Sequence, residues 1–248
     1  MTAPTPGPAP ADGRPSRAER LAALIEATDP TARLRTGTTT PVLPVHQELV
    51  PLLPDGGLRP GTAVEVADAG LLLALAGGAG TWAAVVGMPD LGLAAAHSYG
   101  VDLDRVLLVD DPGTDTWTDV LAALIPAVPL ILLNAPTAIT PHLAQRLTAR
   151  LRQHQCVILT PSYWPGSAVR IEVTTSSWTG LGQGWGQLRE RRIAAASTGR
   201  NGLGTGRRVE VLLPDEHGRV RAIADADEVP VRERARARAG WELAAAAY

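Results

Sequence analysis

The sequence predicts an α/β fold in which helices cover both faces of a mostly parallel central sheet. From residue 45 onward, short and continuously apolar runs alternate with segments that have helical spacing. Strands that are apolar on both faces are typical of parallel sheets buried between helices. After Pro161 the pattern changes to shorter strands with polar flanks, which indicates hairpin-like strands added to one edge of the sheet. We therefore expect a three-layer core with extra C-terminal antiparallel strands and flexible termini.

The expected elements follow one another in a regular order. Residues 45–53 predict a short helix, and residues 54–61 predict a turn-rich link into the first strand. The parallel strands are expected at residues 62–66, 81–87, 106–111, 130–134 and 156–160. The helices between them are expected at residues 71–76, 90–99, 116–125 and 142–154. The later strands are expected at residues 168–174, 187–196, 207–213 and 219–224.

The chain divides into four parts. Residues 1–15 are rich in proline and poor in large apolar side chains, which predicts a disordered arm. Residues 16–44 predict an N-terminal helix, capped by Ser16, and a linker. This helix either packs on the main domain or docks on a partner. Residues 45–224 form the core, and residues 225–248 form an arginine-rich helix or tail.

All 23 basic residues are arginine, because the chain contains no lysine. A Walker A loop uses a lysine to reach the β and γ phosphates of a nucleotide, and Schiff-base chemistry needs an amine whose pKa can be lowered. Arginine does not act as such an amine, because it stays protonated. The composition therefore excludes both kinds of site. The net charge of −2 also excludes a polycation that binds nucleic acid nonspecifically.

Cysteine, histidine and hydropathy patterns set further limits. The single cysteine, Cys156, excludes an internal disulfide and lies in an apolar run typical of a strand in the core. The five histidines have no metal-ligand spacing with it, so we expect no metal. No apolar stretch approaches the roughly 20 residues of a membrane span, and the N-terminus does not look like a secretory signal. We therefore expect a cytoplasmic protein without a membrane partner.

Four motifs, in this order and spacing, carry a resemblance to a known family. Residues 61–65 follow the pattern G-x-x-x-E, and residues 100–104 follow the pattern G-V-D-x-D. Residues 130–134 look like a Walker B strand, and residues 187–213 hold a pair of strands similar to the C-terminal hairpin of that family. Residues 45–224 thus resemble the core of the RecA-like recombinases, which implies a RecA-like three-layer fold.

The resemblance also shows which catalytic groups are changed. The phosphate-binding loop of the family is matched by residues 67–70 alone, which are too few to cradle phosphates and include no lysine. Pro89, with Asp90 beside it, matches the water-activating glutamate, and Asn134 matches the Walker B aspartate that helps to hold Mg²⁺. We therefore expect a pseudo-ATPase that is not an enzyme, with no catalytic or nucleotide-binding residues and no cofactor.

Among RecA-like proteins without these motifs, the whole chain is similar to the ImuA-prime type, an accessory subunit of a bacterial mutasome. The most suggestive stretches are residues 81–113, 164–173 and 178–195. The resemblance implies a non-catalytic adaptor in the SOS response to DNA damage, acting in mutagenic translesion DNA synthesis. Its implied partners are an inactive Y-family polymerase homologue and an error-prone replicative-type polymerase.

Two other functions stay open. A cell-division inhibitor that binds the tubulin-like division protein also reuses a RecA-like core without a Walker A loop. Such inhibitors are normally shorter and lack this arginine-rich end. The third hypothesis is a recombination modulator that binds single-stranded DNA. Its affinity for DNA would depend on salt, because arginines would neutralise the phosphates.

One candidate contact site lies in a glycine-rich segment with two tryptophans and three arginines. Aromatic stacking together with guanidinium contacts to phosphate is a common way to hold single-stranded nucleic acid. The same residue types are favoured at protein interfaces, so the segment contacts DNA or a protein partner, or its tryptophans cover the domain itself. If Arg189 and Arg191 alternate on a strand with Glu190 on the other side, they form one basic face. The candidate residues are Trp178, Trp185, Arg189, Arg191 and Arg192.

The C-terminal tail provides a second candidate contact site. Its arginines stand at every second position, so on a helix they spread around the circumference and form no single stripe. The segment is therefore either a solvated surface or a tail that docks on a partner through a tryptophan anchor. The residues concerned are Arg232, Arg234, Arg236, Arg238 and Trp241.

Overall fold

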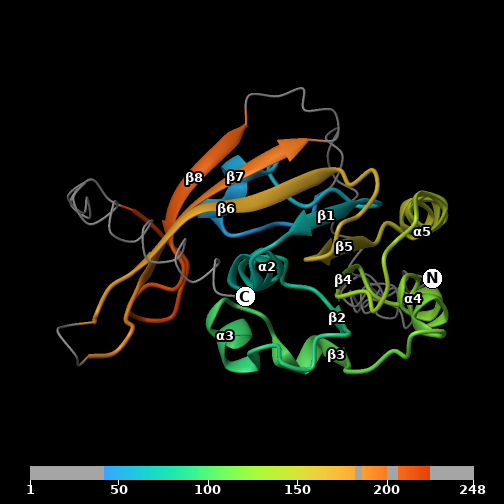
Figure 1. The fold of residues 1–248 in the computed structure, drawn as a ribbon, viewed down its shortest axis with the longest axis horizontal. Coiled ribbons are helices and arrows are strands. Elements are labelled where there is room, and N and C mark those ends of the chain that lie inside the picture. Colours follow the sequence, from blue (N-terminus) through green and yellow to red (C-terminus); the bar gives the residue numbers. More distant parts are fainter. Residues whose placement is uncertain (1–41, 182–185, 200–205, 224–248) are drawn as a thin grey trace, which may run out of the picture. The chain divides into compact units, whose positions relative to one another are not determined.

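A computed structural model describes residues 42–181, 186–199 and 206–223, and a nine-stranded sheet forms the centre of this part of the chain (Figure 1). Its strands are β1 (Ala63–Val66), β2 (Ala83–Val86), β3 (Val106–Val109), β4 (Leu130–Leu133), β5 (Val157–Thr160), β6 (Val169–Trp178), β7 (Arg191–Gly199), β8 (Arg207–Leu212) and β9 (Arg221–Ala222). In space they run in the order β3-β2-β4-β5-β1-β6-β7-β8-β9. The first six pair in parallel, and the last three are added to β6 as antiparallel strands. The predicted fold class is thus confirmed.

The described helices connect the parallel strands. They are the 3-10 helices η2 (Gln47–Leu52) and η3 (Leu103–Arg105) and the α-helices α2 (Ala69–Gly77), α3 (Leu93–Ser98), α4 (Trp117–Leu124) and α5 (Pro141–His154). Each helix and parallel strand expected between residues 62 and 160 is present, with ends that differ by no more than three residues. The expected strand at 187–196 begins only at Arg191, and the one at 219–224 is reduced to two residues.

The short helix expected at residues 45–53 is a 3-10 helix. Pro51 lies inside it and has no N–H to donate to a carbonyl four residues earlier. The N–H of Leu49 instead donates to the carbonyl of His46 at 2.9 Å, which is the closer bond of a 3-10 turn. Leu49 and Leu52 are fully buried, so η2 is held by packing on the sheet.

Alternate residues of the parallel strands face two separate hydrophobic layers. In β1, Val64 and Val66 face the layer that contains the leucines of α2, whereas Ala63 faces the layer that contains α4 and α5. Leu121 of α4 and Leu147 of α5 are buried in the second layer. Helices therefore cover both faces of the same strands, which gives the three layers that the sequence predicts (Figure 1).

Strand β3 departs from the expectation that the apolar strands are covered on both faces. It lies at the edge of the sheet, with a neighbour on one side only. Leu107 and Leu108 point to opposite faces and are 40% and 50% exposed. Helix α3, which precedes β3 in the chain, has six residues and is shorter than the segment expected at residues 90–99.

No helix within the described ranges is long and apolar enough to cross a membrane. The expected arm at residues 1–15 and the tail at residues 225–248 lie outside those ranges, as does most of the expected N-terminal helix and linker.

Close packing between α2 and α3 requires a glycine at the end of α2. A Cβ atom added at Gly77 would overlap the backbone carbonyl of Tyr99, which follows α3. The same carbonyl lies 2.7 Å from Nε2 of His46, so it is fixed on two sides. Backbone atoms cannot move aside as a flexible side chain can.

We therefore expect Gly77→Ala to lower the free energy of unfolding by about 2 kcal/mol or more, the range found for overpacked sites. Urea denaturation followed by circular dichroism measures this difference. Gly199→Ala is the matched control, because a Cβ atom there meets no other atom within 4 Å. Equal stabilities of the two variants would contradict the packing of α2 on α3.

Candidate functional site

Helix α2 begins directly after β1, at the carboxyl edge of the parallel strands, where open α/β sheets usually bind ligands. Asp68 is the N-cap residue of α2, and its Oδ1 accepts a hydrogen bond from the N–H of Leu71 at 2.9 Å. The N-terminus of a helix carries partial positive charge and attracts anions. In this chain the anion at that position is the carboxylate of Asp68 itself.

The guanidinium of Arg191 closes the site from the other side. Its Nη2 lies 2.7 Å from Oδ2 of Asp68, and its Nη1 lies 3.1 Å from Oδ1, so the pair is bidentate. Its Nε donates to Oγ of Ser176 on β6 at 2.9 Å. Both charged side chains are only 17% exposed. All three guanidinium nitrogens of Arg191 are thus engaged within the fold.

The surroundings determine the ionisation of this pair. Burial raises the pKa of Asp68, but the hydrogen bonds and charge of Arg191, together with the N–H groups of Leu71 and Gly70, outweigh it, and the net pKa is lowered. Burial also raises the pKa of the adjacent Tyr99. At neutral pH the site therefore holds a carboxylate, a guanidinium and a neutral phenol.

The two other positions of the resemblance lie at the same edge. Pro89 and Asp90 are exposed in the turn before α3. Asn134 follows β4, and its Oδ1 accepts a hydrogen bond from Oγ of Ser162 at 3.3 Å. The position after β4 therefore presents a neutral amide paired with a hydroxyl. In the described part of the chain, no group of three His, Cys, Asp or Glu side chains is placed to hold a metal ion.

The glutamate of the G-x-x-x-E motif has a structural set of partners. Glu65 is 6% exposed, and its Oε1 accepts the N–H of Trp164 at 3.0 Å. Its Oε2 lies 2.7 Å from Nε of Arg170, whose guanidinium is stacked over the ring of Tyr163. Glu65 thereby fastens the link between β5 and β6 to β1.

Cys156 lies in the core, as the sequence predicts. It is fully buried, and burial raises the pKa of its thiol to about 12. The thiol stays protonated at neutral pH, so it is not an activated nucleophile.

The candidate contact segment forms a β-hairpin between β6 and β7. Beyond the last pair, Trp178 with Arg191, the ladder continues because Arg189 N donates to Thr179 O and Thr179 N donates to Glu190 O. Trp178 is 44% exposed, and Arg189 is also exposed. Trp185 lies outside the described residues, as do Arg232, Arg234, Arg236, Arg238 and Trp241 of the tail.

The structure distributes the arginines of this segment over two faces. Arg191 faces α2, whereas Arg192, the next residue on the strand, points to the opposite face and pairs with Glu210 of β8 at 3.0 Å. Arg189 precedes β7 rather than lying on it, and Glu190 lies 3.7 Å from the guanidinium of Arg221. Arg191 and Arg192 therefore do not lie on one face of the hairpin.

Sequence reasoning missed Asp68 as a functional position. Its cap role has a local signal, because Asp followed by a run of apolar residues is typical of a helix start. Its partner had no such signal, since Arg191 is 123 positions away.

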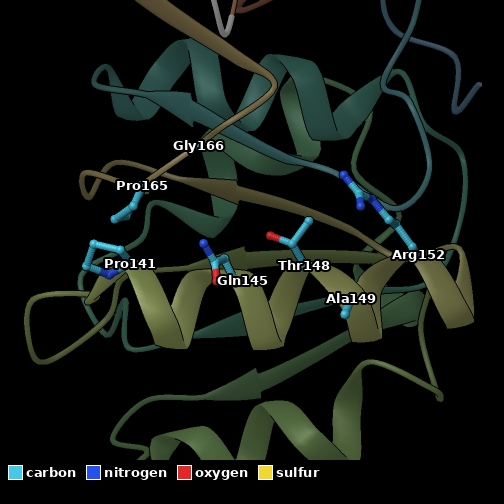
Figure 2. A pocket seen from close by; sticks show the side chains of 7 residues that line it. All are labelled: Pro141, Gln145, Thr148, Ala149, Arg152, Pro165 and Gly166. Carbon is cyan, nitrogen blue, oxygen red and sulfur yellow. The ribbon is translucent and has the colours of Figure 1, made fainter.

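A surface groove lies elsewhere, between α5 and the link that joins β5 to β6 (Figure 2). Its volume is about 460 Å³. Figure 2 shows Pro165, on the link between β5 and β6, opposite Pro141 at the start of α5. The lining residues are Pro141, Gln145, Thr148, Ala149, Arg152, Pro165 and Gly166.

Comparisons with known proteins cover parts of the chain. Residues 51–166 match a family described as the MT3502 N-terminal domain. The chain is 39% identical over 130 residues to the uncharacterized protein Rv3395c of Mycobacterium tuberculosis, which is 50% of this chain and 63%, less than two thirds, of that relative. The crystal structure of the RadB recombinase is similar over 72% of this chain and 97% of the RadB chain, with 15% sequence identity and a TM-score of 0.49.

Two substitutions of Asp68 separate its roles. Asn keeps a hydrogen-bond acceptor at the N-cap but removes the charge, whereas Ala removes both. At neutral pH we expect Asp68→Asn to lower the free energy of unfolding by about 1 to 2 kcal/mol and Asp68→Ala by about 2 to 4 kcal/mol, since each leaves the largely buried Arg191 without its charged partner. Denaturant titration of the three chains gives these differences.

The pH dependence of the same series follows from the lowered pKa of Asp68. A depressed carboxyl pKa stabilises the fold above the unfolded value of about 4, and this contribution is lost as pH falls through the lower folded value. The advantage of wild type over Asp68→Asn therefore shrinks in acid. An advantage that is constant between pH 7 and pH 3 would show that the ion pair does not contribute.

Proposed function

We propose that this protein is a non-catalytic RecA-like adaptor of the ImuA-prime type, acting in damage-induced mutagenic translesion DNA synthesis. The observation that most supports this proposal is the Asp68–Arg191 ion pair at the N-terminus of α2. It occupies the position at which the resemblance would place the phosphates of a nucleotide.

Hydrogen bonding and charge at this site disfavour a bound nucleotide phosphate, so we propose that the chain is not an ATPase. A phosphate bound at a helix N-terminus needs unoccupied N–H groups, and here the N–H of Leu71 already donates to Asp68. A nucleotide phosphate would also stand beside the carboxylate, which repels it. The chain also has no lysine to contact the phosphates, and Asn134 offers a neutral amide where an aspartate would help to hold Mg²⁺.

The adaptor role is supported by apolar surface in two places. Four large apolar side chains with at least 40% exposure lie at or near the β3 edge: Trp82, Leu103, Leu107 and Leu108. Three more lie on the hairpin between β6 and β7: Trp178, Leu181 and Leu188. Exposed apolar patches of this kind commonly mark interaction sites. The proposed partners are the inactive Y-family polymerase homologue and the error-prone replicative-type polymerase, and the proposed setting is the bacterial cytoplasm.

The pairing of the hairpin arginines favours this function over a modulator that binds single-stranded DNA. Arg191 and Arg192 each form an ion pair with a carboxylate of the same chain. A phosphate would have to displace those carboxylates before it gained a contact, which weakens the salt-dependent part of DNA binding.

One preparation of the purified chain tests the proposal against three probes: Mg-ATP, an oligo(dT) and the cognate inactive Y-family homologue. We expect binding of the homologue and no binding of Mg-ATP tighter than about 1 mM by isothermal titration calorimetry. Tight binding of Mg-ATP to wild type would overturn the non-catalytic assignment, and failure to bind the homologue would overturn the adaptor assignment.

Asn134→Asp is the informative companion variant. It restores a carboxylate at the position that resembles the Walker B aspartate but leaves Asp68 and Arg191 in place. We expect it to remain without Mg-ATP affinity. A gain of affinity would mean that the end of α2 is accessible to phosphate.

A further inference from the structure

The outer end of the hairpin between β6 and β7 presents apolar side chains on an ordered stem. We define the hairpin tip as residues 178–181 and 186–190, the described positions from Trp178 of the last β6–β7 pair outward. Trp178 is 44%, Leu181 65% and Leu188 52% exposed. Backbone hydrogen bonds join Thr179 to its opposite strand, and Leu181 pairs with Gly186 in an antiparallel bridge. The tip is thus a continuation of the two-stranded ribbon.

Ion pairs fasten the base of this ribbon on both faces. On one face Arg191 holds Asp68 at the start of α2, and on the other Arg192 holds Glu210 of β8. The backbone N–H of Arg191 also donates to the carbonyl of Pro214 at 2.8 Å. A stem fixed in this way loses little conformational entropy when its tip is bound, which favours affinity.

The charge at the tip differs from that of a nucleic-acid contact. Proteins that hold single strands combine aromatic stacking with several cations along the phosphate path. Here Arg191 and Arg192 at the base already pair with carboxylates, and Glu190 pairs with Arg221, which leaves Arg189 as the exposed arginine of the described tip. Large apolar side chains dominate the exposed surface, and their favourable partner is another apolar surface.

We infer that the hairpin tip inserts its apolar side chains into an apolar groove of a protein partner. This inference rests on the proposed function for the identity of that partner, the inactive Y-family polymerase homologue. Trp178 at the stem and Leu181 and Leu188 farther out act as anchors, and the exposed hydroxyl-bearing residues of β6 line the rim.

The test compares two variants of the full chain. Leu181→Glu combined with Leu188→Glu puts charges on the proposed anchors, which are exposed and outside the core. Gln187→Glu, at an exposed neighbouring position, adds a charge without removing an apolar side chain. Circular dichroism and the thermal midpoint confirm that each variant folds. Affinities for the purified Y-family homologue and for an oligo(dT) are then measured by fluorescence anisotropy.

We expect the leucine variant to bind the homologue about tenfold or more weakly than wild type, and Gln187→Glu to stay within about twofold. Binding of the homologue by the leucine variant at wild-type strength overturns the inference and leaves the proposed function standing. A loss that Gln187→Glu reproduces also overturns it, because charge alone would then explain the effect. Oligo(dT) binding that the leucine substitutions abolish would make the tip a DNA contact instead. If wild type does not bind the homologue, the inference and the proposed function both fail.

Discussion

The ion pair between Asp68 and Arg191 joins the two halves of this fold. Asp68 belongs to the parallel half, at the junction of β1 and α2, and Arg191 begins the antiparallel strand β7. The pair is largely buried and bidentate, so removal of either partner would leave the other charge poorly solvated. This contact adds to the apolar packing of β7 and β8 in the core layer of α2, and together they hold the antiparallel strands against that helix.

The same contact occupies the edge of the sheet at which open α/β folds usually bind ligands. A helix N-terminus that faces an empty site exposes unpaired N–H groups. Here the carboxylate of Asp68 accepts the N–H of Leu71, and the guanidinium of Arg191 neutralises that carboxylate. The residues at this edge thereby contribute to folding, while large apolar side chains remain exposed on the free edge of β3 and on the hairpin.

Local patterns in the sequence predicted the elements well, because continuous apolar runs and helical spacing report burial directly. Contacts between distant residues had no such signal. The N-cap role of Asp68 can be predicted from the apolar residues that follow it in the sequence, but its pairing with Arg191 depends on the tertiary fold. The face of each hairpin arginine depends on where β7 starts, and this strand begins at Arg191, so Arg189 does not lie on it. Likewise, the continuous apolar run of β3 predicts a strand that is covered on both faces. Its exposure follows from its position at the edge of the sheet, which the local sequence does not specify.

The buried side chain of Glu65 fixes the register in which β1 pairs with its two neighbouring strands. In the native register it lies opposite Thr160 of β5 and Arg170 of β6, with its carboxylate on the side away from α2. A shift of β1 by one residue would turn this carboxylate into the leucine layer of α2, where no hydrogen-bond donor replaces Arg170 or the N–H of Trp164. Val64 and Val66 alone would tolerate such a slip, since both faces of the strand are apolar. One buried charge therefore restricts a four-residue strand, at the centre of the sheet, to a single alignment with both of its neighbours.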